Sequence, residues 1–240
     1  MSTDRFGENV AARYDDPTDP ANAPERIAPV VDFLAGLAGD GAALELAIGT
    51  GRIAVPLAGR GVPVKGIELS EAMLARLRAK TPVVEAVAGD MTATRVEGTF
   101  RLVYLVFNTI ENLTTQAAQV ACFRNAAAHL EPGGAFVIEV EVPDLRRLPP
   151  GQTVVPFAVG EDRLGFDEYD VARQGLVSHH FRREDGAWRQ ASIPFRYVWP
   201  AELDLMAELA GLRLADRFAD WDRSPFTAES RKHVSLWTKP

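Results

Sequence analysis

The sequence has almost no cysteine, no long apolar run and no excess of positive charge. Cys122 is the one cysteine among 240 residues, so no internal disulfide can form, and the four histidines lack zinc-finger spacing, so no metal site is expected. No run of about 18 apolar residues occurs and the first residues are polar, so we expect no signal peptide, no membrane span and a cytoplasmic protein. The net charge of −7 argues against nucleic-acid binding, because phosphates need basic patches.

What the chain does contain is a regular alternation of two patterns. Apolar runs at 43–48, 62–67, 83–87, 100–106 and 135–140 predict strands, and helical spacing at 24–38, from 52, from 70 and from 114 or 115 to 130 predicts helices. Residues 131–134 are predicted as a turn. The alternation implies one α/β domain over residues 1–240, with a mostly parallel sheet and helices on both faces.

The pattern changes between residues 150 and 198. Segments rich in β-formers lie at 153–159, 165–172, 176–183 and 188–198, with a hairpin-turn signal at 184–187. We predict a small antiparallel β insertion here, followed by a helix at 200–210 and strands at 212–218 and 233–237. Residues 1–23 are polar and interrupted by prolines, so we expect a loosely structured lead-in.

The stretch from Ala43 to Glu68 carries most of the functional information. A strand pattern ends in Gly49-Thr50-Gly51, a helical pattern follows, and a second strand pattern ends in Glu68. The glycines of this βαβ unit let the chain turn sharply and let a ligand approach the backbone. A carboxylate at the end of the second strand can accept two hydrogen bonds from a ribose diol. The unit therefore indicates nucleoside binding.

Three motifs together resemble one enzyme family. Glu45-x-Ala47-x-Gly49-x-Gly51, then Glu68, then Gly89-Asp90-Met91 follow in the order and spacing of class I S-adenosylmethionine-dependent methyltransferases. The β insertion makes the chain similar to the small-molecule branch, such as the glycine and amino-sugar N-methyltransferases. The resemblance implies a Rossmann-like seven-stranded sheet whose last strand is antiparallel. It also implies S-adenosyl-L-methionine as cofactor, S-adenosyl-L-homocysteine as product, and methyl transfer to N or O of a small-molecule acceptor.

The resemblance also assigns residues to the cofactor. The turn would cradle the methionine part, Glu68 the ribose hydroxyls, and Asp90 the adenine amino group. Residues 1–38 would lie over the cofactor, and residues 150–198 would cover the acceptor. The cofactor-binding residues implied are Tyr14, Glu45, Ala47, Gly49, Gly51, Arg52, Glu68, Leu69, Met73, Asp90, Met91 and Phe107. Ala47 stands where the family usually has a glycine.

Two other functions remain open from the sequence. Gly49-Thr50-Gly51-Arg52-Ile53-Ala54 also fits the dinucleotide pattern G-x-G-x-x-A, so an NAD(P)-dependent oxidoreductase is the first alternative. The Ser-x-x-Met-Leu stretch that begins at Ser70 and the pair Asp90-Met91 count against it. A non-catalytic nucleoside-binding module is the second alternative, because a fold alone does not establish an activity.

The acceptor site is predicted in the insertion and after the fourth strand. Methyl transfer is an in-line displacement, and a base is needed only if the acceptor must lose a proton. Strand alternation puts His179 and His180 on opposite faces, so one faces inward as a candidate base, and Tyr14 is a further catalytic candidate. The candidate acceptor contacts are Asn108, Thr109, Glu111, Asn112 and Tyr169. A monomer or a homodimer is expected.

Overall fold

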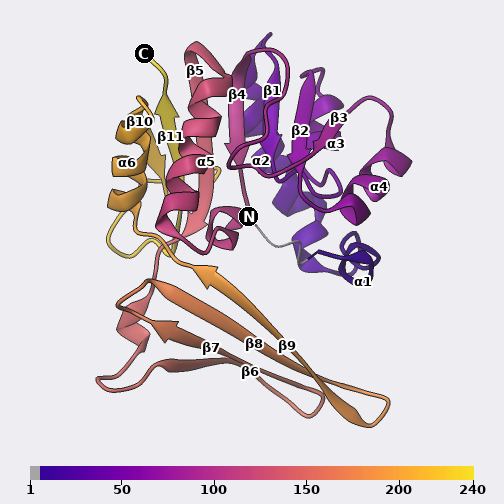
Figure 1. Ribbon diagram of the computed structural model, residues 1–240, viewed down its shortest axis with the longest axis vertical. Helices are drawn as coiled ribbons and strands as arrows, with labels where there is room; N and C mark the ends of the chain where they lie inside the picture. The colour runs from indigo at the N-terminus through magenta and orange to yellow at the C-terminus, as the bar shows by residue number, and fades with distance from the viewer. Residues whose placement is uncertain (1–5) are drawn as a thin grey trace.

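The computed structural model describes residues 6–240 and contains two separate β-sheets, of seven and of four strands. The larger sheet and its helices form the upper body in Figure 1, and the smaller sheet lies below. The large sheet has the order β10-β11-β5-β4-β1-β2-β3, and β11 is antiparallel to both of its neighbours. Its strands are β1 (Ala43–Leu46), β2 (Val64–Glu68), β3 (Glu85–Ala88), β4 (Phe100–Leu105), β5 (Leu130–Glu141), β10 (Arg213–Phe218) and β11 (Lys232–Thr238).

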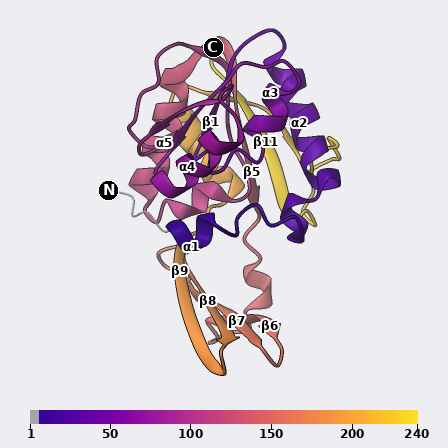
Figure 2. The ribbon, with the colours of Figure 1, turned by 90° about the vertical axis from the view of Figure 1, so that its right-hand side faces the viewer.

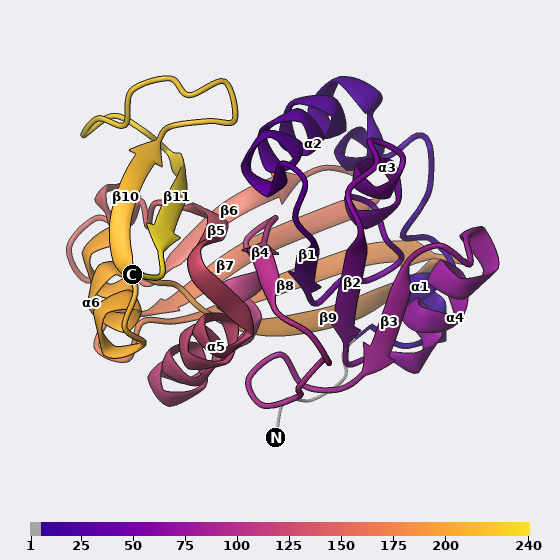
Figure 3. The same ribbon diagram turned by 90° about the horizontal axis from the view of Figure 1, so that it is seen from above.

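Helices cover both faces of the large sheet, as Figure 3 shows from above. On one face lie α2 (Pro24–Ala38) and α3 (Ala54–Ala58), and on the other lie α5 (Gln116–His129) and α6 (Pro200–Leu209). The remaining helix of this body, α4 (Glu71–Lys80), packs beside β2 and β3. Side-chain caps begin two of these helices: Ser70 Oγ accepts from Met73 N, and Thr115 Oγ1 accepts from Ala118 N.

The strands divide the core between the two faces. Leu44 and Leu46 belong to the cluster that packs on α5 and α6, whereas Ala43 belongs to the cluster on α2 and α3. Successive strand residues point to opposite faces, so an apolar run becomes two cores when both faces are covered. In open α/β sheets, ligands bind at the edge where the parallel strands have their carboxyl ends.

The smaller sheet is inserted between β5 and α6. It consists of β6 (Val154–Val159), β7 (Arg163–Asp170), β8 (Gly175–Glu184) and β9 (Ala187–Arg196), which pair antiparallel in chain order. Figure 3 shows it lying beneath the large sheet, across the ends of the parallel strands. The buried Arg196 ties it to the main body through an ion pair with Glu202 at 2.7 Å and a hydrogen bond to Gln119. The predicted fold class, β insertion included, is confirmed.

Two local predictions are wrong. The lead-in is not loosely structured over residues 6–23, because it forms the short helices α1 (Glu8–Ala11) and η1 (Pro20–Asn22), and Asp19 caps the second by accepting from Ala21 N. Residues 1–5 of that stretch lie outside the described residues. Residues 131–134, predicted as a turn, are part of β5. The pairing of β5 with β4 shifts register between Phe100 and Leu102, and this irregularity accommodates the glycines.

The other short helices, η2 (Thr109–Asn112) and η3 (Leu145–Arg147), follow β4 and β5 respectively. η2 lies at the end of the large sheet that faces the smaller one, and η3 lies lower, beside the smaller sheet (Figure 1). Within residues 6–240, no helix combines the length and the apolar character needed to cross a membrane.

Candidate active site

The turn after β1 holds its backbone in the left-handed region at three alternate residues. Ala47, Gly49 and Gly51 have φ angles of 54°, 59° and 82°. A side chain on Gly51 would also collide with Leu77 and Val55. Glycine adopts this region without steric cost, whereas alanine pays about 1–2 kcal/mol. The structure thus explains why a glycine is usual at the position of Ala47, and backbone strain of this kind concentrates at functional sites.

Glu45 supports this turn from within the core. Its Oε2 accepts a hydrogen bond from Tyr104 Oη at 3.0 Å, and its side chain is only 4% exposed. Burial raises the pKa of the Glu45 carboxyl to about 8, so it is protonated at neutral pH. Its place in the site is therefore structural, beneath the turn.

Glu68, at the end of β2, is brought directly to the glycine turn. Its Oε2 accepts from Gly49 N at 2.7 Å, and its Oε1 accepts from Ser70 N at 2.8 Å. The carboxylate therefore joins the turn after β1 to the start of α4. The two motifs that lie 19 residues apart in sequence form one site at the edge of the sheet.

A half-buried cation lies beside the same turn. The Arg52 guanidinium stands 4.5 Å from the centroid of the Tyr14 ring and 5.0 Å from that of Phe107. Its Nε is buried and has no hydrogen-bond partner within the described part of the chain. Burial raises the pKa of the Tyr14 hydroxyl, so this ring stays neutral next to the cation. A buried donor that lacks an acceptor is costly unless a ligand satisfies it, and an anionic group fits it best.

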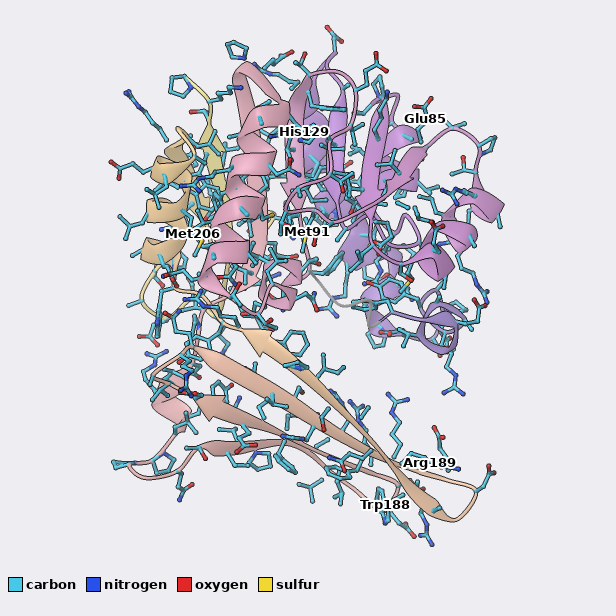
Figure 4. The ribbon with its side chains drawn as sticks, in the orientation of Figure 1. Glu85, Met91, His129, Trp188, Arg189 and Met206 are labelled. Carbon is cyan, nitrogen blue, oxygen red and sulfur yellow. The ribbon has the colours of Figure 1, made fainter. Side chains whose placement is uncertain are left out.

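A small pocket opens where β1, β2 and β3 end. It is lined by Ala47, Ile67, Leu69, Gly89, Asp90 and Met91. The pocket measures about 30 Å³, apolar side chains form most of its lining, and the Asp90 carboxylate, whose Oδ1 accepts from Thr92 N and Oγ1, is its one charged group. Met91 lies at this inner position in Figure 4, whereas Met73 is in the core, 2% exposed, and is not among the lining residues.

The tip of β4 is strained as well. Phe107 and Asn108 both have left-handed backbones, with φ angles of 56° and 59°. Asn108 Oδ1 accepts from Glu141 N at 2.7 Å, which fixes the tip against the end of β5. Thr109 and Asn112 bond locally, to Val106 O and to Thr109 O. Their side chains therefore brace η2.

Sequence reasoning missed Glu139, which lies beside this tip. Its carboxylate accepts from Phe107 N at 3.2 Å and from Trp221 Nε1 at 3.0 Å, and it pairs with Lys232 at 3.3 Å. Together with Asn108, these residues line a cavity of about 450 Å³. The signal was available, because an acid in the apolar run of β5 is rare unless it is paired.

Acids from three elements gather between the two sheets. Burial, and after it the negative charges of Glu141 and Asp167, raise the pKa of the Glu111 carboxyl to about 8. Asp167 and Glu111 also raise the pKa of Tyr169, after burial, so all four side chains share one electrostatic environment. The predicted acceptor residues Glu111 and Tyr169 are thus brought together, from η2 and β7.

The register of the smaller sheet separates the two histidines. Asp167 pairs with Ser178, and His180 Nε2 lies 3.1 Å from Ser178 Oγ, so His180 shares the face of Asp167, which looks toward the acids. Burial lowers the pKa of His180, so it is neutral at neutral pH. His179 lies on the opposite face, with its Nδ1 2.9 Å from Ser192 Oγ. The inward histidine is therefore His180.

Comparison with known proteins shows which proteins share this sequence and fold. Residues 43–134 match the family model described as "Methyltransferase domain". The cypemycin N-terminal methyltransferase of a Streptomyces species is 30% identical over 194 residues, which is 79% of each chain. Among solved structures, the CcbJ methyltransferase from Streptomyces caelestis matches with a TM-score of 0.85 and 38% identity, covering 98% of this chain and 97% of that one.

A more distant structure carries the cofactor. CalS10, an amino pentose methyltransferase from Micromonospora echinaspora with bound S-adenosylmethionine, has a TM-score of 0.72 and 24% identity over the full length of both chains. The glycine turn, the acids at two strand ends and the unpartnered Arg52 donor suit this molecule's ribose, adenine and carboxylate. The chain belongs to the S-adenosylmethionine-dependent methyltransferases.

Proposed function

We propose that the protein methylates an amine nitrogen of a small molecule. The observation that carries this proposal is the group of acids Glu111, Glu141 and Asp167, which come from η2, β5 and β7 and are close enough for the charges of Glu141 and Asp167 to act on Glu111. Acids attract a cationic ammonium and can receive its proton. The names of two relatives are consistent with an amine acceptor, because one refers to an N-terminus and the other to an amino pentose.

We assign the cofactor contacts as follows. Arg52 holds the carboxylate of the methionine part, Glu68 holds the ribose hydroxyls, and Asp90 accepts from the adenine amino group. Leu69 and Met91 flank the adenine, Met73 packs in the core behind them, and Tyr14 covers the site. Support comes from the buried Nε of Arg52 and from the pocket at the ends of β1–β3. The G-x-G-x-x-A pattern had left an NAD(P)-dependent oxidoreductase open as an alternative. That alternative does not apply, because the chain is a methyltransferase.

S-adenosylmethionine supplies a methyl group already activated on its sulfonium, so the protein's task is positioning and proton removal. We assign proton removal from the acceptor ammonium to Glu111. A base works best when its pKa is near the working pH, and the pKa of about 8 meets that condition. Deprotonation leaves a nitrogen lone pair free to attack. His180, neutral and on the same side, is assigned to acceptor contact together with Tyr169.

The first test is calorimetric titration of the purified protein with S-adenosylmethionine, S-adenosylhomocysteine and NADH. We expect micromolar dissociation constants for the first two and no heat with NADH. Mass spectrometry after incubation with panels of small amines and small alcohols then identifies the acceptor class. If only the alcohols are methylated, the proposed amine acceptor is refuted.

The second test separates the acceptor-side residues. We expect Glu111→Gln and His180→Ala to lower kcat with little change in cofactor affinity. His179→Ala is the matched control, because it changes the neighbouring residue on the other face of β8. The rate of the wild type should rise through about pH 8, whereas Glu111→Gln should lose that rise. Wild-type turnover in Glu111→Gln at every pH contradicts the assignment.

The proposal also covers location and assembly. We propose a cytoplasmic enzyme that binds no nucleic acid and acts as a monomer or a homodimer. The net charge of −7 supports the absence of nucleic acid. The outward face of the smaller sheet supports a homodimer contact, because Val154, Val159 and Leu164 are 42%, 84% and 39% exposed there. Light scattering over a range of concentrations distinguishes the two states.

A further inference from the structure

The segment from residue 6 to residue 23 spans the cofactor edge like a strap, as Figure 2 shows for α1 and the chain that leads to α2. One end is attached to α4: Ser70 Oγ donates to Phe6 O at 2.7 Å, and Glu8 pairs with Arg76 at 3.5 Å. The other end continues into α2. Tyr14, the residue that stacks on Arg52, lies between these two attachments.

A three-residue contact holds the middle of the strap. Asp15 Oδ1 accepts from Thr50 Oγ1 at 2.6 Å, and Asp15 Oδ2 lies 2.7 Å from Lys80 Nζ. Lys80 Nζ also donates to Thr50 O at 2.8 Å, so each residue touches the other two. Thr50 belongs to the glycine turn and is fully buried. We call Asp15, Thr50 and Lys80 the latch.

The latch is polar, and the strap is not packed tightly beneath it. A cavity of about 450 Å³ lies at this place, lined by residues that include Asp15, Asn22, Ile27, Arg52 and Lys80. The side chains of Asp15 and Lys80 are 35% and 34% exposed, so water reaches the ion pair. The strap can therefore leave the glycine turn by breaking these polar contacts and the Tyr14–Arg52 contact, while Ala11, its buried apolar residue, belongs to neither of the two core clusters.

We propose that Asp15, Thr50 and Lys80 are positioning residues that hold Tyr14 over the cofactor and set the rate at which S-adenosylhomocysteine leaves. The inference rests on the proposed cofactor contacts of Tyr14 and Arg52. Asp15 acts on the site through its neighbour Tyr14, whose carbonyl is also fixed by Asn22 Nδ2 at 3.0 Å. When the latch is formed, the ring covers Arg52 and the glycine turn. When it opens, the ring moves away and the bound molecule has a path out.

The physical basis is a pair of charge-assisted hydrogen bonds at an accessible place. Such bonds are short and stronger than neutral ones, but partial exposure makes the ion pair sensitive to salt. Removal of one latch contact should therefore raise the equilibrium constant for opening of the strap by about tenfold. The Asp15–Lys80 attraction should also weaken as ionic strength rises.

The experiment measures release directly. S-adenosylhomocysteine is bound to the wild type and to Asp15→Ala, Lys80→Met and Thr50→Val, and its dissociation is followed in stopped flow after a chase with excess S-adenosylmethionine. We expect release to be about tenfold faster in each variant. Release from the wild type should also be faster in 1 M salt, because the shorter Debye length screens the Asp15–Lys80 attraction. Lys80→Met should lose that salt response.

A readout without any cofactor tests the same motion. Trypsin cleaves after exposed arginines, and Arg13 lies in the strap. We expect faster cleavage after Arg13 in Asp15→Ala and Lys80→Met, at an unchanged melting temperature. Asp16→Asn is the matched control, because the Asp16 side chain accepts from Thr18 N and Oγ1, within the strap itself. Arg78→Met controls for charge loss on α4, since Arg78 pairs with Glu71 and not with the strap.

The outcomes separate this inference from the proposed function. If the wild type binds S-adenosylhomocysteine but the latch variants release it and are cleaved at the wild-type rate, the latch is wrong and the cofactor site stands. If the wild type binds no S-adenosylhomocysteine, the proposed function fails first. If Asp15→Ala does not fold, Asp15→Asn keeps an acceptor for Thr50 and removes only the ion pair, and it should still lose the salt response.

Discussion

The two sheets of this protein consist of similar strands but are covered differently. All four residues of β1 are buried, because helices pack on both faces of the large sheet. The first six residues of β9 are exposed, and in Figure 4 Trp188 and Arg189 stand at the outer end of the smaller sheet, far from the main body. β1 pairs with β2 and β4, whereas β9 is an edge strand that pairs with β8 alone, so the two differ in pairing as well as in cover. This difference is consistent with the proposed roles, in which the large sheet holds the cofactor and the smaller one contacts the acceptor.

The strongest test of this contrast is a pair of truncations. Phe136 is fully buried between Phe123 and Trp237, whereas Val159 is 84% exposed on β6. Phe136→Ala should lower the free energy of unfolding by about 3–5 kcal/mol, and Val159→Ala should change it by less than about 0.5 kcal/mol. Urea unfolding measures both. Equal losses would mean that the smaller sheet is covered in solution, for example by a second copy.

A comparison of two acids, one from each sheet, extends the contrast to ligand binding. Glu68 accepts two backbone hydrogen bonds at the cofactor edge, whereas Glu168 lies on the outward face of β7, beside His179. Glu68→Ala should weaken binding of S-adenosylmethionine by about 2–3 kcal/mol, through the lost ribose contact and a loosened turn. Glu168→Ala should bind it like the wild type. Unchanged affinity in Glu68→Ala, measured by calorimetry, refutes the ribose assignment.

The pH dependence of stability should arise mainly in the large sheet. Burial raises the folded-state pKa of Glu45 from 4.5 to about 8, so between these values the unfolded chain loses a proton that the folded chain keeps. Stability should therefore fall as pH rises from about 4.5 to 8, by up to about 1.4 kcal/mol per pH unit, and level off above. Glu45→Gln should remove the Glu45 share of this slope and leave the share of Glu111, whose pKa is also raised to about 8. Thermal melts at several pH values measure it, and an equal slope in the variant would contradict it.

The smallest effect concerns two residues with left-handed backbones. Ala47 and Gln174 have φ angles of 54° and 55°. Ala47→Gly should raise stability by about 0.5–1 kcal/mol, because glycine relieves the strain at a partly offsetting entropic cost. Gln174→Gly should lower stability, because the Gln174 side chain bonds Tyr197 O and Glu202 at the base of the smaller sheet. Thermal unfolding compares the two, and a loss in Ala47→Gly would show that its methyl group packs usefully.

Sequence alone predicted the large sheet well, because its signals are local. The apolar runs gave its strands, and the glycines and end-of-strand acids gave the edge where Glu68 meets Gly49. The insertion was predicted as strands, but period-two alternation cannot say which face looks inward. The inward position of His180 follows only from its register opposite Gly165 and beside Asp167.

What sequence could not give were the contacts made over long separations. Asp15 meets Thr50 across 35 residues, and Trp221 meets Glu139 across 82. Such pairs depend on how loops return to the sheet, and no local pattern encodes that return. Glu139 was the exception, since its place in an apolar strand was visible and was not used.

The order of the strands has a consequence for synthesis of the chain. β11 lies between β5 and β10, yet β10 precedes it in the sequence. A ribosome therefore delivers β10 before the strand that links it to the sheet exists, and β10 must wait unpaired while later residues emerge. Until β11 inserts, β5 offers an open edge that another nascent chain could pair with. We expect stalled chains that end before Lys232 to require chaperones, and chains that include Thr238 to be released from them.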